Sequence, residues 1–346
     1  MASHRRPKQP SRARISVFTA AAATAVALTA QASAHAAPAQ PNKDEVKAQV
    51  DKLLEEQEQS AEKYNGAKER ADQLRKQADD LQDQVARGQE QLTELASGLA
   101  AVAGDQYRQG GVDPSMQLML SSNPDQYLTQ ATSFGQAAST QAETLKSLKD
   151  QQRRLDQQKQ EASQVLQELD SQTQALNDAK NDVNAKLAEA QKLLSKLNAA
   201  DRASILRGSG GGTASRSASR VDPSTLPPAS GYAATAVAAA LGKQGSAYVW
   251  GATGSSTFDC SGLMVWAYKQ AGVSLPRTSQ SQGSYGTNVG TDWHNAQPGD
   301  LVIYYGDRHH VGMYIGNGLV VHAPRTGDVV KTMKVDTLPI STIRRV

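Results

Sequence analysis

Apolar residues recur every seven positions over much of the N-terminal half of the chain, and this repeat constrains the fold more than any other feature. Two stretches, about residues 44–102 and 127–197, place mainly apolar side chains at alternating steps of four and three. This is the spacing of a coiled-coil seam. Polar residues interrupt the second seam, so its packing should be loose in places. We expect a long antiparallel hairpin of helices over residues 42–207, and a parallel dimer through either seam is the alternative.

The segment between the two repeats contains glycines, a proline and an apolar cluster, namely Gly110, Gly111, Pro114, Met116, Leu118, Met119 and Leu120. It is either a loop that packs on itself or a docking surface for a partner. After Arg207 the chain becomes rich in Gly and Ser. Residues 208–230 therefore predict a flexible tether.

The N-terminus has the features of an export signal. Basic residues between Arg5 and Arg14 precede an apolar, Ala-rich stretch over about residues 17–30, and small residues follow at 32–36. This order is typical of a secretory signal peptide, so we expect residues 1–36 to be removed and the mature protein to lie outside the membrane. The apolar run is shorter than the ~20 residues of a spanning helix; a short membrane anchor is the alternative.

Aromatic residues concentrate at the other end of the chain. All three Trp and seven of the ten Tyr follow residue 230, and large aromatic side chains are typical of a compact core. Helical stretches at 232–241 and after Asp259 are followed by strand candidates at 301–305, 310–315, 319–323 and 329–335. One helix against a small antiparallel sheet predicts an α+β domain over residues 231–346. The net charge of +3 is small, and nothing in it predicts binding to nucleic acid.

Cys260 is the only cysteine, and an unpaired thiol in an exported protein suggests a function. Asp259 is a plausible helix N-cap, which would place Cys260 at the positive end of a helix dipole, where the thiol pKa is lowered. A buried, inert cysteine is the alternative. A base is also at hand, because the mature chain has four histidines, all in this domain: His294, His309, His310 and His322.

Strand parity selects among these histidines. In residues 310–315 the apolar Val311, Met313 and Ile315 share one face, so His310 should face a cleft on the other side, and His309 is the weaker candidate. His322 lies diagonal to His310 if the strands pair with an index sum of 634, as a three-residue loop would give. A two-residue turn, with a sum of 635, would turn His322 to the wrong face. We favour the first register.

Six motifs then occur in order: YVWG at 248–251, DCSGL at 259–263, PRT at 276–278, PGDLV at 298–302, HVGMYIG at 310–316 and HAP at 322–324. Together they resemble the NlpC-type family of cell-wall peptidases. The resemblance implies a papain-like domain in which Cys260 is the nucleophile, His310 the base and His322 the orienting group. It also implies that Tyr248 shapes the oxyanion site, that no metal or other cofactor is needed, and that Asp259, Ser261 and Arg277 hold substrate.

The resemblance further implies hydrolysis of peptidoglycan stem peptides between γ-D-glutamate and the next diamino acid. An amidase or acyltransferase of the same fold is one alternative. A non-catalytic scaffold that activates other wall enzymes is another. The hairpin resembles, more loosely, regulators that couple wall hydrolases to a division-associated membrane complex. Because a tether holds the hairpin near the domain, we expect it to fold back over Cys260 and restrain it.

Overall fold

The computed structural model describes residues 42–108, 116, 124–206, 220–229 and 231–346. The expected signal peptide at 1–36, most of the segment between the two repeats and the first part of the tether lie outside these residues. Residues 41–346 form one compact unit. Within the described part of the chain, no helix combines the length and the apolar character that a membrane crossing requires.

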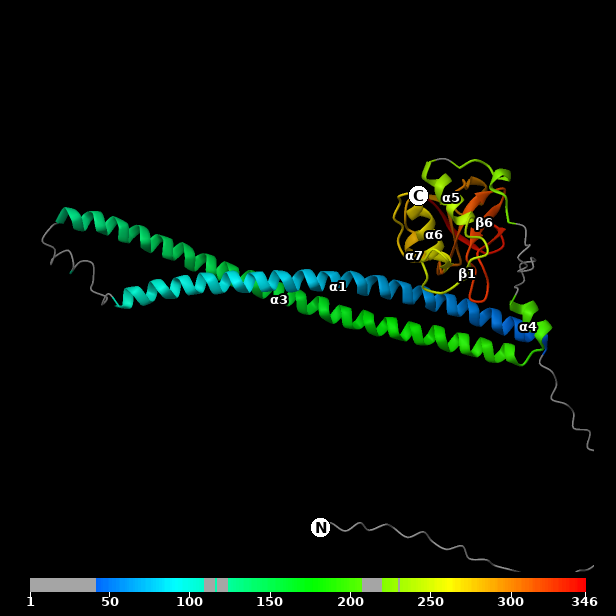
Figure 1. The fold of residues 1–346 in the computed structure, drawn as a ribbon, viewed down its shortest axis with the longest axis horizontal. Helices are drawn as coiled ribbons and strands as arrows, with labels where there is room; N and C mark the ends of the chain where they lie inside the picture. The colour runs from blue at the N-terminus through cyan, green and yellow to red at the C-terminus, as the bar shows by residue number, and fades with distance from the viewer. Residues whose placement is uncertain (1–41, 109–115, 117–123, 207–219, 230) are drawn as a thin grey trace, which may run out of the picture. The chain divides into compact units, whose positions relative to one another are not determined.

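Two long helices, α1 (Lys43–Arg108) and α3 (Pro124–Ser195), pack against each other and are followed by the short α4 (Ala199–Leu206) (Figure 1). Cross-helix hydrogen bonds join residues whose numbers rise on one helix while they fall on the other: Ser60 with Asp182, Arg70 with Glu168, Gln84 with Gln158, and Gln91 with Gln151. The two helices are therefore antiparallel, and the predicted hairpin is confirmed.

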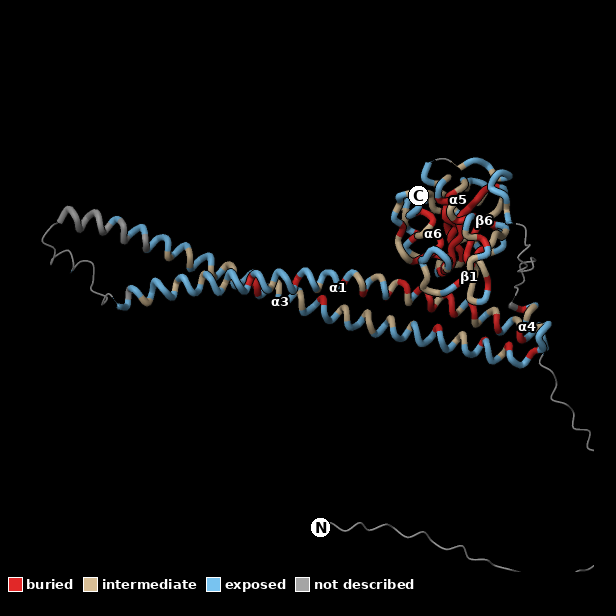
Figure 2. Tube along the Cα trace, in the orientation of Figure 1, coloured by how far each residue is buried: buried red, intermediate tan, exposed pale blue. Residues whose placement is uncertain are grey.

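The seam is closed over only part of the hairpin. Buried apolar residues gather near α4, at Val46, Val50, Leu54, Ala190, Leu194, Leu197 and Ile205, and farther along at Leu74, Leu81 and Val165. Among the described residues, α1 has no buried side chain after Gly88 and α3 has none before Leu155 (Figure 2). The sequence places Leu145, Leu166 and Val102 in the seam, but they are 48%, 55% and 40% exposed. A strict seven-residue repeat drifts around a straight helix, which moves these positions off the interface.

The C-terminal domain consists of three helices and a six-stranded antiparallel sheet of order β3-β8-β4-β5-β6-β7. The helices are α5 (Gly231–Leu241), α6 (Cys260–Gln270) and α7 (Ser279–Gln282). The strands are β3 (Thr287–Gly290), β4 (Leu301–Tyr304), β5 (His310–Gly316), β6 (Leu319–His322), β7 (Lys331–Lys334) and β8 (Ile340–Arg345). Two short strands, β1 (Ala247–Tyr248) and β2 (Thr257–Phe258), pair in parallel. This is the α+β plan that the sequence predicts, with β1, β2, β3 and β8 in addition.

Both faces of the central strands are covered. The face carrying Val311 and Met313 packs against α5 and α6 in one core cluster. Tyr314 lies in a second cluster with Val302 and Ile343, and it is 7% exposed. Strand parity predicts that His310 faces a cleft on the side of the strand that carries Tyr314. Around Tyr314 itself, this side is filled by side chains of the neighbouring strands and of Trp293.

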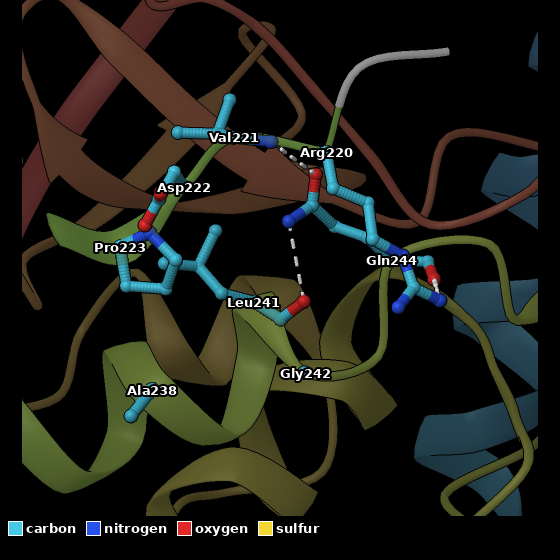
Figure 3. Close-up of a pocket in the computed structure, with 8 residues that line it drawn as sticks. All are labelled: Arg220, Val221, Asp222, Pro223, Ala238, Leu241, Gly242 and Gln244. Atoms are coloured by element: carbon cyan, nitrogen blue, oxygen red, sulfur yellow. Dashed lines mark hydrogen bonds between the residues drawn. The ribbon is translucent and has the colours of Figure 1, made fainter. Parts of the chain in front are cut away.

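Residues 220–229, within the range that composition assigns to a flexible tether, pack on the domain. Val221, Leu226 and Ala229 lie against its core, and the Arg220 guanidinium donates to the Gln244 carbonyl at 3.1 Å. A shallow pocket of about 410 Å³ lies beside this segment, lined mainly by apolar atoms (Figure 3). The apolar members of the segment explain the difference, because they gain more by burial than a Gly/Ser chain can.

Candidate active site

Helix α6 presents Cys260 at its first residue because Asp259 caps the helix. The backbone of Asp259 is extended. Its carboxylate accepts hydrogen bonds from the backbone N–H of Gly262 at 2.7 Å and of Gly251 at 2.8 Å. A Cβ at position 262 would lie 2.1 Å from the Ala252 carbonyl oxygen, so this turn requires glycine there. The predicted cap is confirmed, and it fixes Cys260 at the helix end.

His310, the first residue of β5, lies beside this thiol. A ring nitrogen of His310 and the Cys260 Sγ are within 4.8 Å of each other, whereas His309 accepts a hydrogen bond from the sulfur with its backbone carbonyl oxygen, at 3.8 Å. The His309 ring instead bonds Asp307 at 2.5 Å and stacks on Tyr305. The geometry therefore agrees with the choice of His310 over His309.

His322 completes a line of three side chains. Its Nδ1 is 2.9 Å from the Nε2 of His310. Burial, followed by the charges of His310 and Lys331, lowers the pKa of His322 well below its ordinary value. His322 is therefore neutral in this site and can hold the ring of His310 in a fixed orientation.

The register that brings these two histidines together differs from the expected one in its turn. Met313 pairs with Val321 and Tyr314 with Val320, which is the favoured index sum of 634. The turn itself has two residues, Asn317 and Gly318, at φ 53° and 68°, as a type I′ hairpin needs. An irregularity between Tyr314 and Gly316 shifts the pairing by one residue. The predicted register is therefore produced by a β-bulge and a two-residue turn, and the predicted three-residue loop is wrong.

The other expected site residues surround the thiol. Arg277 forms a bidentate ion pair with Asp259, at 2.6 and 3.1 Å, and donates to the Ser261 Oγ at 2.8 Å. Tyr248 is 4% exposed, and burial, with smaller contributions from the charges of Glu58 and Cys260, raises its pKa well above its ordinary value. All seven expected residues therefore lie in one cluster, in which six are buried and Arg277 is partly exposed.

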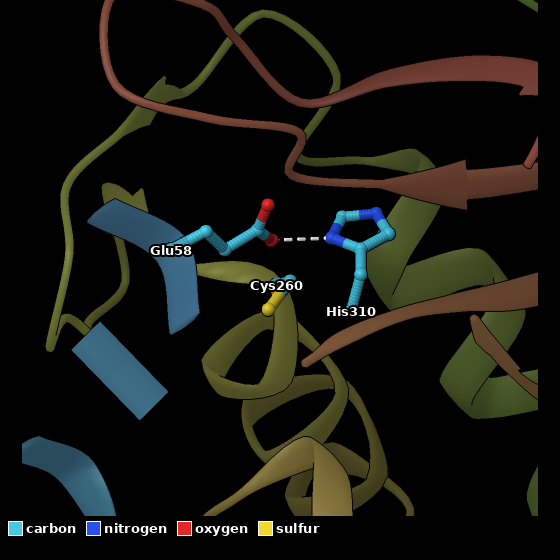
Figure 4. A group of neighbouring side chains, drawn as sticks. All are labelled: Glu58, Cys260 and His310. Atoms are coloured by element: carbon cyan, nitrogen blue, oxygen red, sulfur yellow. Dashed lines mark hydrogen bonds and ion pairs between the residues drawn. The ribbon is translucent and has the colours of Figure 1, made fainter. Parts of the chain in front are cut away.

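Three residues of α1 enter this cluster, and sequence reasoning missed all three. Glu58 Oε1 lies 2.5 Å from the Nδ1 of His310 (Figure 4). Because a carboxylate can only accept, the His310 nitrogen donates this hydrogen bond. Glu62 and Asn65 follow on the same face of the helix at spacings of four and three. The Asn65 amide donates to the Asp259 carboxylate at 3.0 Å.

Glu62, like Asn65, is only 2% exposed. Its Oε2 accepts from the Ser279 N–H at 2.7 Å and from the Ser279 Oγ at 2.9 Å. Its Oε1 lies 2.7 Å from the Ser261 Oγ and 3.9 Å from the Cys260 Sγ. The carboxyl group thus occupies the space directly beside the thiol.

Peripheral contacts fix α1 on both sides of these acids. Asp51 pairs with Arg325 at 2.6 Å, and Gln57 accepts from the Thr326 hydroxyl at 3.0 Å. On the other side the Tyr64 ring meets Trp250 edge to face, with centroids 5.0 Å apart. The repeat places Gln57 and Tyr64 in the hairpin seam; their polar or aromatic character at seam positions was the available signal that this face of α1 has another partner.

Cys260 is not poised as a thiolate in this arrangement. Burial first, and then the carboxylates of Glu62, Glu58 and Asp259, raise its pKa well above the ordinary thiol value. The expectation that the helix dipole lowers this pKa is wrong for this state of the molecule, because a helix end contributes far less than full burial beside three acids.

Glu58, Cys260 and His310 are also a set of side chains of the types that bind metal, with one donor atom each within 4.8 Å of the others. The Glu58 oxygen and the His310 nitrogen are joined directly at 2.5 Å. Two ligands bonded to zinc at ~2.0–2.2 Å lie farther apart than this in a tetrahedral site. The set therefore fits a hydrogen-bonded cluster and does not fit a metal centre.

Comparisons with known proteins agree with the motifs. Residues 245–342 match the model of the NlpC/P60 family. A probable endopeptidase of Corynebacterium glutamicum is 46% identical over 112 residues, which is 32% of this chain and 53% of that protein. A probable endopeptidase of Mycobacterium tuberculosis is 42% identical over 125 residues, 36% of this chain and 32% of that protein. The chain thus spans about half or less of the length of these relatives.

Among solved structures, the NlpC/p60 domain of the peptidoglycan hydrolase SagA is 31% identical. The match covers 33% of this chain and 98% of that one, with a TM-score of 0.31.

Proposed function

We propose that this chain, which belongs to the NlpC/P60 family through its residues 245–342, is a peptidoglycan endopeptidase that works by a cysteine thiol. The observation that supports this best is the line of Cys260, His310 and His322 at the capped end of α6. The substrate we infer is the peptidoglycan stem peptide, cut between γ-D-glutamate and the diamino acid that follows.

The reaction follows from these groups. His310 takes the proton of Cys260, and the thiolate attacks the carbonyl carbon of the scissile amide. The oxygen carries the negative charge of the tetrahedral intermediate beside Tyr248, whose hydroxyl can donate to it. As the C–N bond breaks, His310 returns the proton to the leaving amine, and a thioester remains. Water, deprotonated by His310, then hydrolyses the thioester and releases the acid and the thiol. We assign substrate binding to Asp259, Ser261 and Arg277.

We further infer that α1 holds the enzyme inactive. Glu58 accepts a hydrogen bond from the His310 Nδ1, and Glu62 fills the space beside the sulfur. Cys260 is only 1% exposed. A carbonyl carbon cannot approach a thiol that is covered in this way, and a thiol with a raised pKa supplies little thiolate. The hairpin must therefore leave the site before substrate enters.

We infer that the protein acts in the cell wall after export. The part of the hairpin that we assign to an activating partner, such as a division-associated membrane complex, is the part beyond Gly88 and before Leu155. Its described residues include the exposed Val102 and Leu145, so side chains there are available for a contact that does not compete with the seam.

The test compares residues 37–346 with residues 220–346 on defined muropeptides, with products identified by mass spectrometry. We expect the shorter protein to release the γ-D-glutamyl product faster, and Cys260→Ala to release none in either form. Cleavage at a sugar-linked amide, or transfer to an added amine, would identify an amidase or an acyltransferase instead. Equal rates for the two proteins would contradict the inhibitory role of α1.

A further inference from the structure

The Glu62 carboxyl lies in a pocket that offsets only part of its charge. The titratable and charged groups around it are Glu58 on its own helix, Asp259 and Cys260 at the start of α6, Arg277 before α7, and Tyr248 on β1. The guanidinium of Arg277 is committed to both oxygens of Asp259. Glu58, in turn, has His310 as its partner.

Glu62 has only neutral donors in direct contact among the described residues, on Ser261, Ser279, Asn65 and Cys260. A buried carboxylate without a cation pays a large desolvation cost. Protonation removes that cost, provided that the new hydrogen finds an acceptor.

The structure provides such an acceptor. A hydrogen on Glu62 Oε1 can be donated to the Ser261 Oγ at 2.7 Å. The Ser261 hydroxyl can then turn its own hydrogen toward Asp259 Oδ1, 3.4 Å away, while it continues to accept from Arg277. Oε2 keeps both of its bonds from Ser279. The protonated acid is therefore satisfied without any movement of the backbone.

We propose that closure of α1 on the C-terminal domain is linked to proton uptake: Glu62 gains a proton as it enters the site, so acid tightens the closed state and alkali loosens it. This inference rests on the proposed inhibition by α1. The direction agrees with the electrostatics, because burial and then the charge of Asp259 raise the pKa of Glu62 from 4.5 to about 7.

The sign and size of the effect follow from linkage. Glu62 has a higher pKa closed than open, so the closed state gains stability as the pH falls from about 7 toward 4.5, and the gain is absent above about 8. With these two values the ratio of closed to open molecules falls about 25-fold between pH 5.5 and pH 8. The hydrogen bond between Glu58 and His310 also joins α1 to the site, so a test must compare two proteins that both keep it.

Cys260 provides the measurement, because it is the only thiol and is covered when α1 is closed. The experiment follows alkylation by iodoacetamide from pH 5.5 to pH 8 in the 37–346 protein and in its Glu62→Gln variant, which has no acid at this position. Both proteins keep Cys260, Glu58 and His310. Taking the ratio of their two alkylation rates therefore removes effects of pH that come from these residues. We expect the rate of the unmodified protein relative to the variant to rise about 25-fold over this range. Glu55→Gln, at an exposed position of the same helix, should behave as the unmodified protein.

A ratio that stays constant with pH, while both proteins alkylate far more slowly than the same chains unfolded in urea, would overturn the proton linkage and leave the closure by α1 intact. Alkylation of both folded proteins at the rate of the unfolded chains would instead overturn the closure, and the linkage with it.

Discussion

Replacement of Glu58 by alanine tests how strongly α1 restrains the site. Glu58 contributes one hydrogen bond at 2.5 Å to the buried His310, and a bond to a charged group contributes about 1.5–3 kcal/mol. Since 1.36 kcal/mol corresponds to a factor of ten, this is about 10- to 150-fold in the balance of closed and open molecules. The variant also loses the cost of burying a carboxylate, so we expect the lower end, about tenfold.

Two assays measure this change in residues 37–346. Both alkylation of Cys260 and release of muropeptide should become about tenfold faster in Glu58→Ala, up to the rate of residues 220–346. Glu55→Ala, an exposed acid one turn away, is the matched control and should leave both rates as they are. If Glu58→Ala reacts no faster than the unmodified protein, the bond to His310 does not hold the enzyme closed.

Three further sets of substitutions test the site and its scaffold. Cys260→Ala should abolish hydrolysis while circular dichroism stays unchanged, and retained activity of the purified variant would refute the thiol mechanism. In the 220–346 protein, His310→Ala should be as severe as the cysteine change, with His322→Ala intermediate and His309→Ala mild; a crippling effect of His309→Ala would reverse the choice of base. Gly299 has φ 102°, and a Cβ there would lie 2.5 Å from the Ala233 Cβ, so Gly299→Ala should lower Tm by on the order of 10 °C, from at least about 2 kcal/mol of strain and crowding. Gly306→Ala, where nothing lies within 4 Å, should leave Tm unchanged.

The parts of the fold that depend on local signals could be predicted from the sequence. The heptad steps predicted the hairpin, Asp259 predicted the start of α6, and the alternation along the strand indicated His310. The pairing of Met313 with Val321 was also correct, although its cause, a bulge at the strand end, was not foreseen. In each case the residues that decide the outcome lie within a few positions of one another.

The remaining features depend on contacts between distant parts of the chain. Glu58 and His310 are separated by 252 positions, and no local pattern relates them. In a helix with many acidic residues, the sequence does not distinguish an acid that will be buried from one that will be exposed. Nothing in the sequence therefore singled out Glu62. The raised pKa of Cys260 has the same origin, because its largest cause is burial, and α1 supplies two of the acids beside it. Sequence reasoning identified the thiol but could not foresee what covers it.

A peptidase that keeps a segment of its own chain against its nucleophile risks cutting that segment. Here α1 runs as continuous helix from Lys43 to Arg108 and reaches the sulfur through the Glu62 side chain. Within such a helix each peptide group is already bonded to its neighbours along the axis, and its carbonyl carbon lies behind a layer of side chains. Self-cleavage would require several turns to unwind first. If α1 inhibits the enzyme as we propose, its regular secondary structure would protect it from cleavage, and the same segment could close the site again after each release.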